Sequence, residues 1–252
     1  EGVTLTSVVA AMLAGLVEGR DATYPSNLRV MLLGGGPAPA DLQARAGELG
    51  LPIAPPEGLT EAASQVTTLL PAEFSARPGS AGAPLPQAEV RIERDGEPLP
   101  PGADRDFAVR SLTLMRGYLG QPALPPGAWF RTGDLGRMDP DGYLTVLDRR
   151  DDLIVSGGEN VYPAEVESAL ASHPDVREAA VVAGPDPKWG SVPVAFVVIR
   201  DGSEASDADL LAHVASRLAR YKQPKRIVRV DALPRTAAGK VRRRELRDRA
   251  RA

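Results

Sequence analysis

Apolar residues recur at helical spacing near the start of the chain and then form runs typical of buried strands. Positions 7–17 place their apolar residues on one helical face, with Ser7 as the expected N-cap. The run 29–33 predicts a buried strand, and a glycine turn separates it from a helix expected at 41–49. A short strand is expected at 52–54. Strand, glycine turn and helix in this order indicate an α/β unit that binds ligands at the carboxyl ends of its strands.

Beyond residue 70 the pattern changes to short strands separated by turns. Strands are expected at 89–93, 107–110 and 143–147. Each of the pairs Asp-Gly or Pro-Gly between them is a turn signal. This part of the chain therefore predicts a small antiparallel β unit.

The last hundred or so residues return to an alternation of helices and strands. Helices are expected at 163–172 and 207–218, and strands at 176–182, 194–199 and 227–230. A set of this kind can form a small α+β domain of its own. The predicted fold class is thus α/β and α+β, with a small α+β domain at the C-terminus.

A dense run of charged residues from Asp148 to Asp152 separates these parts. Three apolar residues, 153–155, and then the pair Gly157-Gly158 follow it. Five charged residues in a row suit an exposed joint better than a core. Glycine lets backbone N–H groups approach a ligand without side chains in the way. We expect a hinge here, with a ligand-facing loop just beyond it.

Composition narrows the class of protein. The chain has 252 residues, 43% of them hydrophobic and 25% charged, which is typical of a soluble globular protein with one or two domains. A net charge of −3 gives no electrostatic footprint for nucleic acid, and no apolar run is long enough to span a membrane. The chain has no cysteine, no initiator Met and no signal peptide. We therefore expect a cytoplasmic protein, of which this chain is a part.

Several short motifs carry groups suited to nucleotide chemistry, and each has a purely structural alternative. Glycines 34–36 could hold a nucleotide or acyl group against bare backbone, or simply form a tight turn. Thr60 and Glu61 could meet a phosphate oxygen and a Mg²⁺ ion, or begin a helix as its N-cap and first-turn acid. Asp134, flanked by glycines in an expected turn, could accept two hydrogen bonds from a ribose diol or bond its own backbone.

Lys240 stands on a small-residue loop in a chain with only four lysines. A mobile ammonium suits the charge that develops in phosphoryl or acyl transfer, and the alternative is a solvated surface lysine. The neighbouring arginines 242–244 predict a solvated helix face or a patch that attracts polyphosphate. His173 and His213 fall in expected helices without a readable Ser or Asp partner, so we interpret both as structural.

In chain order the motifs read GGGPAP, GLTE, WFRTGDLG, LDRRDDLI with SGGENVYPAEVE, and LPRTAAGK. Their order and separations resemble the adenylate-forming superfamily of acyl- and aryl-CoA synthetases, peptide-synthetase adenylation domains and luciferases. The resemblance covers essentially the whole chain. Within the superfamily, GLTEAASQV, SGGENVYPAEVE and KWGSVP are most similar to the o-succinylbenzoate–CoA ligases of menaquinone biosynthesis.

This resemblance implies an AMP-forming acid–thiol ligase that makes an acyl-adenylate from a carboxylate and Mg-ATP and then an acyl-CoA. The partners implied are the small carboxylate, ATP, Mg²⁺ and CoA, with a homodimer left open. Residues 1–148 would be the C-terminal part of the large AMP-binding domain, 149–151 the hinge, and 152–252 the mobile C-terminal domain.

The resemblance also implies roles for single residues. Thr60 would hold the α-phosphate, Glu61 the Mg²⁺ ion and Asp134 the ribose hydroxyls, with Arg149 assisting at ribose or phosphate. Asp151 falls at the hinge position. Three more roles follow: nucleotide or acyl binding by Gly34, Gly35 and Gly36, contact with the pantetheine arm of CoA by Gly157 and Gly158, and a bridge between carboxylate, α-phosphate and ribose by Lys240.

The chain departs from the family in two respects. The aromatic residue that stacks on adenine just before the GLTE turn is replaced by Glu57, which cannot stack and repels phosphates. The phosphate loop rich in Ser, Thr and Gly is absent, so we expect this chain alone to be inactive. Three hypotheses remain: a ligase for o-succinylbenzoate, a ligase for another aryl or fatty acid, and a truncated, non-catalytic binding module.

Overall fold

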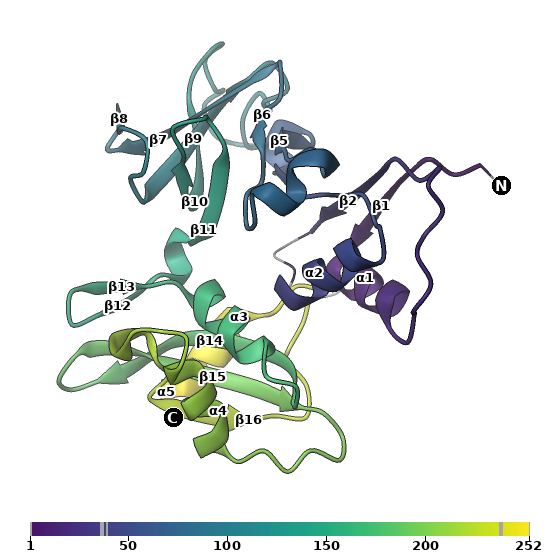
Figure 1. Ribbon diagram of the computed structural model, residues 1–252. Helices are drawn as coiled ribbons and strands as arrows, with labels where there is room; N and C mark the ends of the chain where they lie inside the picture. The colour runs from purple at the N-terminus through teal and green to yellow at the C-terminus, as the bar shows by residue number, and fades with distance from the viewer. Residues whose placement is uncertain (1, 36–37, 39, 237–238, 252) are drawn as a thin grey trace. The chain divides into compact units, whose positions relative to one another are not determined.

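The computed structural model describes residues 2–35, 38, 40–236 and 239–251 (Figure 1). Its contacts divide the chain into two compact units, the first ending at Leu147 and the second beginning at Asp148. Each unit has its own apolar clusters, and each is described by itself below. Among the described residues, no helix is both long and apolar enough to cross a membrane.

The first unit begins with a three-stranded parallel sheet in the order β1-β2-β3. Its strands are β1 (Leu5–Val9), β2 (Val30–Gly34) and β3 (Ile53–Ala54). Helices α1 (Ala10–Val17) and α2 (Ala40–Glu48) contact each other and share one apolar cluster with the strands. This is the predicted α/β unit.

The predicted start of the first helix is wrong. Ser7 lies within β1 and pairs with Leu32 of β2, while Val9 is the residue before α1 and makes no side-chain cap bond. The sequence over 5–9 contains two valines and two residues with hydroxyl groups on Cβ, and the parallel pairing with β2 satisfies its backbone groups. Sheet pairing over several residues outweighs the preference of one serine for a cap.

The rest of the first unit is antiparallel β structure, as predicted. A small sheet joins β4 (Pro56–Gly58), β5 (Gln65–Thr68) and β6 (Ala83–Pro84). A five-stranded sheet has the order β11-β10-β9-β7-β8. Its strands are β7 (Ala88–Arg94), β8 (Glu97–Pro98), β9 (Arg105–Ser111), β10 (Phe130–Met138) and β11 (Leu144–Arg149). Ala62, Val66 and Phe107 belong to one buried cluster, so both sheets share a core.

The second unit is built on the sheet β14-β15-β16, with β14 (Val176–Asp186), β15 (Gly190–Ile199) and β16 (Arg226–Arg229). Strand β15 is buried over Val192–Val198 because alternate residues enter different cores. Ala195 and Val197 pack with helices α3 (Pro163–Ala171) and α4 (Asp207–Ala215). Phe196 and Val198 pack with α5 (Arg243–Arg251). The α+β prediction is confirmed.

Helix α4 begins with a capping box. The Ser206 hydroxyl accepts from the backbone N–H of Asp209, and the Asp209 carboxylate accepts from the backbone N–H of Ser206. We expect Ser206→Ala to lower the free energy of unfolding of the second unit by about 1 kcal/mol in urea denaturation. The control Ser216→Ala, at the other end of the helix, should change it by less than about 0.5 kcal/mol. Equal losses would contradict the capping account.

Candidate functional site

Thr60 and Glu61 lie in a tight turn between β4 and β5, in the short 3-10 helix Thr60–Ala62. Gly58 allows this turn, because a Cβ there would lie only 2.5 Å from the carbonyl oxygen of Ser64. Leu59 precedes the helix and makes no side-chain cap bond, so Thr60 is not an N-cap. Thr60 is exposed and Glu61 is half-buried. The turn thus presents a hydroxyl and a carboxylate side by side at the surface of the first unit.

A residue that sequence reasoning missed reaches this turn from a distant segment. The Tyr118 hydroxyl donates to Oε1 of Glu61 at 2.7 Å, and the backbone N–H of Met115 donates to the Glu61 carbonyl at 2.6 Å. The hydrogen bond to the carboxylate, together with desolvation and the negative charge of Glu61, raises the pKa of Tyr118. The two partners are 57 positions apart in the sequence, so no local sequence pattern reveals this contact.

The glycine turn after β2 lies close to β4, the strand that leads to Thr60 and Glu61. Gly34 ends β2, and a Cβ on it would lie 3.8 Å from the ring of Pro56, the first residue of β4. Gly35 follows in the turn, and Gly36 lies outside the described residues. The structure therefore brings Gly34 and the strand leading to Thr60 together within the first unit.

Asp134 is almost fully buried, with 6% of its surface exposed. The predicted turn around it is wrong: it lies within β10, where the register with β9 shifts between Arg131 and Leu135. The hydroxyl of Thr132 accepts from the Asp134 N–H and donates to the carbonyl of Phe107. A bulge of this kind redirects a side chain from the regular pleat, which makes it a suitable support for a binding carboxylate.

The prediction of an exposed joint at 148–152 is wrong for two of its five residues, since Asp148 is buried and Asp152 is half-buried. Asp148 is buried and accepts from the backbone N–H groups of Arg149 and Ala164, the second at the start of α3. Burial raises the pKa of Asp148 although both hydrogen bonds act to lower it. Arg149 and Asp151 are exposed.

The expectation that arginines 242–244 are solvated is wrong for Arg243. Its guanidinium pairs with Glu167 at 2.5 Å and with Asp152 at 3.4 Å, and donates to the carbonyl of Val181. Burial acts to lower the pKa of Arg243, but the hydrogen bond and charge of Glu167 and the charge of Asp152 outweigh it and raise the pKa. Arg247 donates to Asp152 as well. Helix α5 is therefore tied to residue 152 by ion pairs within the second unit.

Gly157 and Gly158 form the two-residue turn between β12 (Ile154–Ser156) and β13 (Glu159–Val161). Their φ angles are +60° and +92°, the left-handed values that a type I′ hairpin turn requires at both positions. The Trp189 ring covers Gly157 so closely that a Cβ there would lie 2.6 Å from it, and the Gly157 N–H donates to the Trp189 carbonyl. Hairpin geometry and Trp189 together account for glycine at 157.

Lys240 is exposed on a small loop closed by the bridge between Arg235 and Val241. Its backbone N–H donates to the Thr236 hydroxyl at 3.2 Å, and its carbonyl accepts from the Thr236 N–H at 2.8 Å. Arg235 also donates to the carbonyl of Gly239. The loop thus fixes the backbone of Lys240 while its ammonium extends from the surface of the second unit.

The surroundings of the two histidines differ from what the sequence indicated. Nε2 of His213 lies 2.8 Å from the hydroxyl of Ser172, a partner that the sequence did not indicate. His173 follows α3 in a turn instead of lying in a helix, and its ring packs edge-on against His213 with centroids 4.9 Å apart. The Ser172 hydroxyl donates to the Ala169 carbonyl. The group therefore joins α3 to α4, and the structural interpretation of both histidines stands as a hypothesis.

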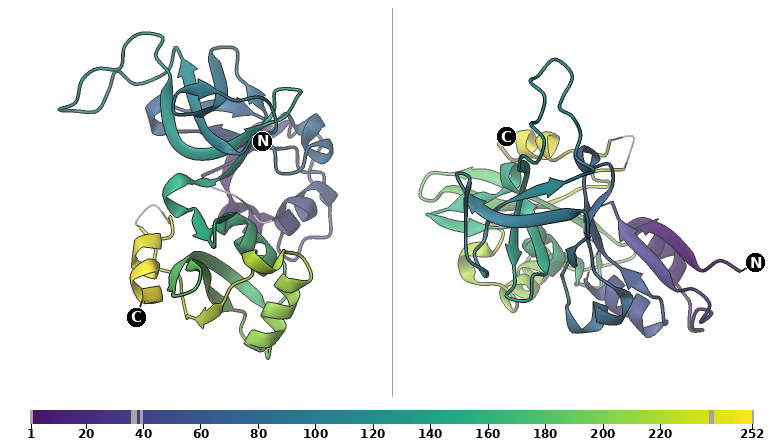
Figure 2. Two further views of the ribbon diagram at one scale, coloured as in Figure 1. Left: turned by 90° about the vertical axis from the view of Figure 1, so that its left-hand side faces the viewer. Right: turned by 90° about the horizontal axis from the view of Figure 1, so that it is seen from above.

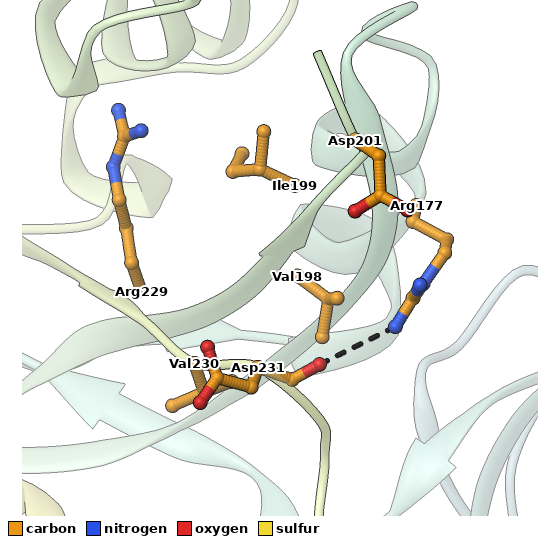
Figure 3. A pocket seen from close by; sticks show the side chains of 7 residues that line it. All are labelled: Arg177, Val198, Ile199, Asp201, Arg229, Val230 and Asp231. Atoms are coloured by element: carbon orange, nitrogen blue, oxygen red, sulfur yellow. Dashed lines mark hydrogen bonds between the residues drawn. The ribbon is translucent and has the colours of Figure 1, made fainter. Parts of the chain in front are cut away.

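One hollow of about 290 Å³ lies on the second unit, beside the ends of β15 and β16 (Figure 3). Its charged lining residues are Arg177, Asp201, Arg229 and Asp231. Arg177 donates to the backbone carbonyl of Asp231 across it. The residues that line it include none of the predicted site residues.

Family models match both units. The model described as AMP-binding enzyme matches residues 1–119, and that described as AMP-binding enzyme C-terminal domain matches 165–240. The chain belongs to the AMP-binding enzyme family. This membership confirms the superfamily resemblance read from the ordered motifs.

Individual relatives of this AMP-binding family member are similar over nearly its full length. The 2-succinylbenzoate–CoA ligase of Geobacillus kaustophilus is 50% identical over 97% of this chain and 51% of its own length. The o-succinylbenzoate CoA synthetase of Bacillus subtilis, solved with the acyl-adenylate intermediate OSB-AMP, is 44% identical with a TM-score of 0.91. The match covers 98% of this chain and 51% of the Bacillus subtilis chain. The same enzyme with ATP and magnesium ion gives 43% identity and a TM-score of 0.89, over 97% of this chain and 51% of its own. The chain spans about half the length of the curated relatives it matches.

Proposed function

We propose that this chain is the C-terminal half of an AMP-forming acid–thiol ligase whose carboxylate substrate is o-succinylbenzoate. The observation that carries the proposal is the 50% identity with the Geobacillus kaustophilus ligase over 250 residues that span both units. A match of this length, which spans both units, supports a shared reaction. The proposal includes a cytoplasmic location, where ATP and CoA are available.

The reaction has two steps in this proposal. A carboxylate oxygen of the acid attacks the α-phosphorus of ATP, the bond to the β-phosphate breaks, and pyrophosphate leaves. The thiol of CoA then loses its proton and attacks the acyl carbon, so that AMP leaves with the electron pair of the acyl–oxygen bond. Asp151 is the proposed pivot between the two steps, and Gly157 and Gly158 are the proposed contacts for the pantetheine arm of CoA.

Three side chains are the proposed ligands of the nucleotide. Thr60 donates to an α-phosphate oxygen, Asp134 accepts from the ribose hydroxyls, and Arg149 assists at ribose or phosphate. Gly34, Gly35 and Gly36 are the proposed backbone contacts for the nucleotide or acyl group.

Glu61 fits the requirements of a Mg²⁺ ligand. It is a half-buried carboxylate beside an exposed hydroxyl. The described residues hold no group of three or more His, Cys, Asp or Glu that could bind a metal. Mg²⁺ commonly binds through one or two carboxylates together with substrate phosphates and water, and this donor set matches that pattern. When bound, the ion offsets the negative charge that develops on the phosphates.

A hybrid enzyme tests the proposed activity. It joins the upstream half of the Geobacillus kaustophilus ligase to this chain, whose matched region covers the remaining half. We expect o-succinylbenzoate to drive pyrophosphate release and CoA consumption at least about 100-fold faster than fatty or other aryl acids, since a mismatched pocket loses several kcal/mol. The chain alone should give no exchange between ATP and pyrophosphate.

Two outcomes would overturn parts of the proposal. A hybrid that prefers another acid would remove the substrate assignment and favour the second hypothesis, a ligase for a different carboxylate. A folded hybrid inactive with every acid would favour a binding module, to which Glu57 of β4 already points because its carboxylate cannot stack on adenine. Sedimentation of the hybrid tests the homodimer hypothesis.

A further inference from the structure

The segment between β9 and β10 is long, and it extends beyond the five-stranded sheet in both views of Figure 2. A hydrogen bond of 2.8 Å from the Leu124 N–H to the Arg116 carbonyl closes a loop at its middle. Within that loop, the Gln121 N–H donates to the Tyr118 carbonyl. Gly117 fits the base of the loop, where a Cβ would lie 3.1 Å from the carbonyl oxygen of Pro122. The loop is thus built by backbone hydrogen bonds.

Apolar burial does not hold the tip of this loop. Leu119 is fully exposed and Tyr118 is 49% exposed. What fixes Tyr118 is its hydroxyl, which donates to Oε1 of Glu61 at 2.7 Å. The backbone bond from Met115 to Glu61 adds a second attachment at the same residue. Both attachments converge on the carboxylate-bearing residue of the Thr60-Glu61 turn.

We propose that Tyr118 is a positioning residue for Glu61, holding its carboxylate in the orientation that binds the Mg²⁺ ion of Mg-ATP. The inference rests on the proposed function, which assigns Glu61 to that ion. An ionised carboxylate offers about four acceptor sites, so a hydrogen bond at Oε1 is compatible with coordination of a metal. Hydrogen bonds to a ligating carboxylate commonly determine metal affinity, and their loss costs about 10- to 100-fold.

The test measures Mn²⁺ binding to the 252-residue chain by electron paramagnetic resonance, with and without ATP, using Mn²⁺ as a spectroscopic substitute for Mg²⁺. We expect Tyr118→Phe to weaken Mn²⁺ affinity about 10-fold. Glu61→Gln should remove the site. Circular dichroism melting should show Tyr118→Phe within a few degrees of the parent chain, because its ring is half exposed.

Tyr143→Phe is the matched control. Its hydroxyl donates to the carboxylate of Glu73, so the variant removes a second Tyr–Glu hydrogen bond of the same unit. The Phe ring preserves the packing of Arg77 over the aromatic face. We expect Mn²⁺ affinity unchanged in this variant, which separates the loss of any such bond from the loss of the one at Glu61.

The outcomes distinguish this inference from the proposed function. If Glu61→Gln weakens Mn²⁺ binding while Tyr118→Phe leaves it unchanged or tightens it, the positioning role is wrong and the metal assignment stands. If the parent chain shows no Mn²⁺ binding, or binding that Glu61→Gln leaves unchanged, both the inference and the metal assignment are overturned. A fall in affinity for both Tyr118→Phe and Tyr143→Phe would overturn the inference as well, since it would indicate a general effect on the unit.

Discussion

Replacing Lys240 by alanine in the hybrid ligase is expected to lower acyl-adenylate formation by about 100- to 1000-fold, the cost of removing one charge-stabilising donor from a transition state. Thioester formation from supplied acyl-adenylate and CoA should change by less than about threefold, because in that step the phosphoryl transfer is already complete. Pyrophosphate exchange measures the first step, and release of AMP from added acyl-adenylate measures the second. The backbone of Lys240 is held by Thr236, so the substitution removes the ammonium without unfolding the loop.

Lys225→Ala is the control for that experiment. Lys225 is an exposed lysine of the same unit, and its backbone N–H donates to Pro193. It should leave both steps unchanged, which shows that the loss of any surface charge is not sufficient. Equal losses in both steps for Lys240→Ala would contradict a role confined to adenylation.

Much of the fold could be predicted from local patterns, because long periodic segments carry their own signal. The helix expected at 163–172 is α3 (Pro163–Ala171), and the apolar run at 194–199 lies within β15 (Gly190–Ile199). The helix expected at 7–17 fails at its start, since residues 5–9 pair with β2. A strand this short is fixed by its neighbour, and the neighbour is 25 residues away in the register Leu5 to Val30.

The candidate site shows the same division between local and distant information. Thr60, Glu61 and Lys240 could be selected from short motifs, since the residue types and turns that carry phosphate chemistry are local. Tyr118 could not, because its hydroxyl meets Glu61 across 57 residues. The type I′ turn at Gly157 and Gly158 gives those glycines a conformational reason that is independent of any ligand.

The density of charged residues gave a wrong prediction of solvent exposure for parts of two runs. A run of charged residues at 148–152 and another at 242–244 each favour a solvated surface when they are considered alone. In the structure they belong partly to one network, since Arg243 and Arg247 both pair with Asp152. Asp152 is 91 positions from Arg243 and 95 from Arg247 in the sequence. These charges come together only in the folded unit, so no local sequence pattern predicts that they pair.

Arg243→Met is expected to destabilise the second unit by about 3 kcal/mol, because breaking a buried ion pair leaves an uncompensated charge. The side chains of Arg243, Glu167 and Asp152 are 21%, 16% and 15% exposed, so solvent screens the remaining carboxylates poorly. Methionine retains much of the apolar stem of the arginine, which limits the effect of lost packing. Urea denaturation followed by Trp189 fluorescence in a Trp129→Phe background measures this unit, since the chain has two tryptophans.

Two further variants decide whether charge is the cause. Arg244→Met changes the exposed neighbour on the same helix and should shift the free energy of unfolding by less than about 0.5 kcal/mol. Combining Arg243→Met with Glu167→Gln should recover part of the loss, because it removes a stranded carboxylate and keeps an acceptor for the Val181 N–H. Glu167→Gln alone has its own cost in free energy of unfolding. If the double variant is less stable than Arg243→Met by this full cost, the two residues are uncoupled and lost packing explains the effect of Arg243→Met. Recovery would instead assign it to the ion pair, which together with the Asp152 pairs ties helix α5 to the segment that contains the proposed pivot.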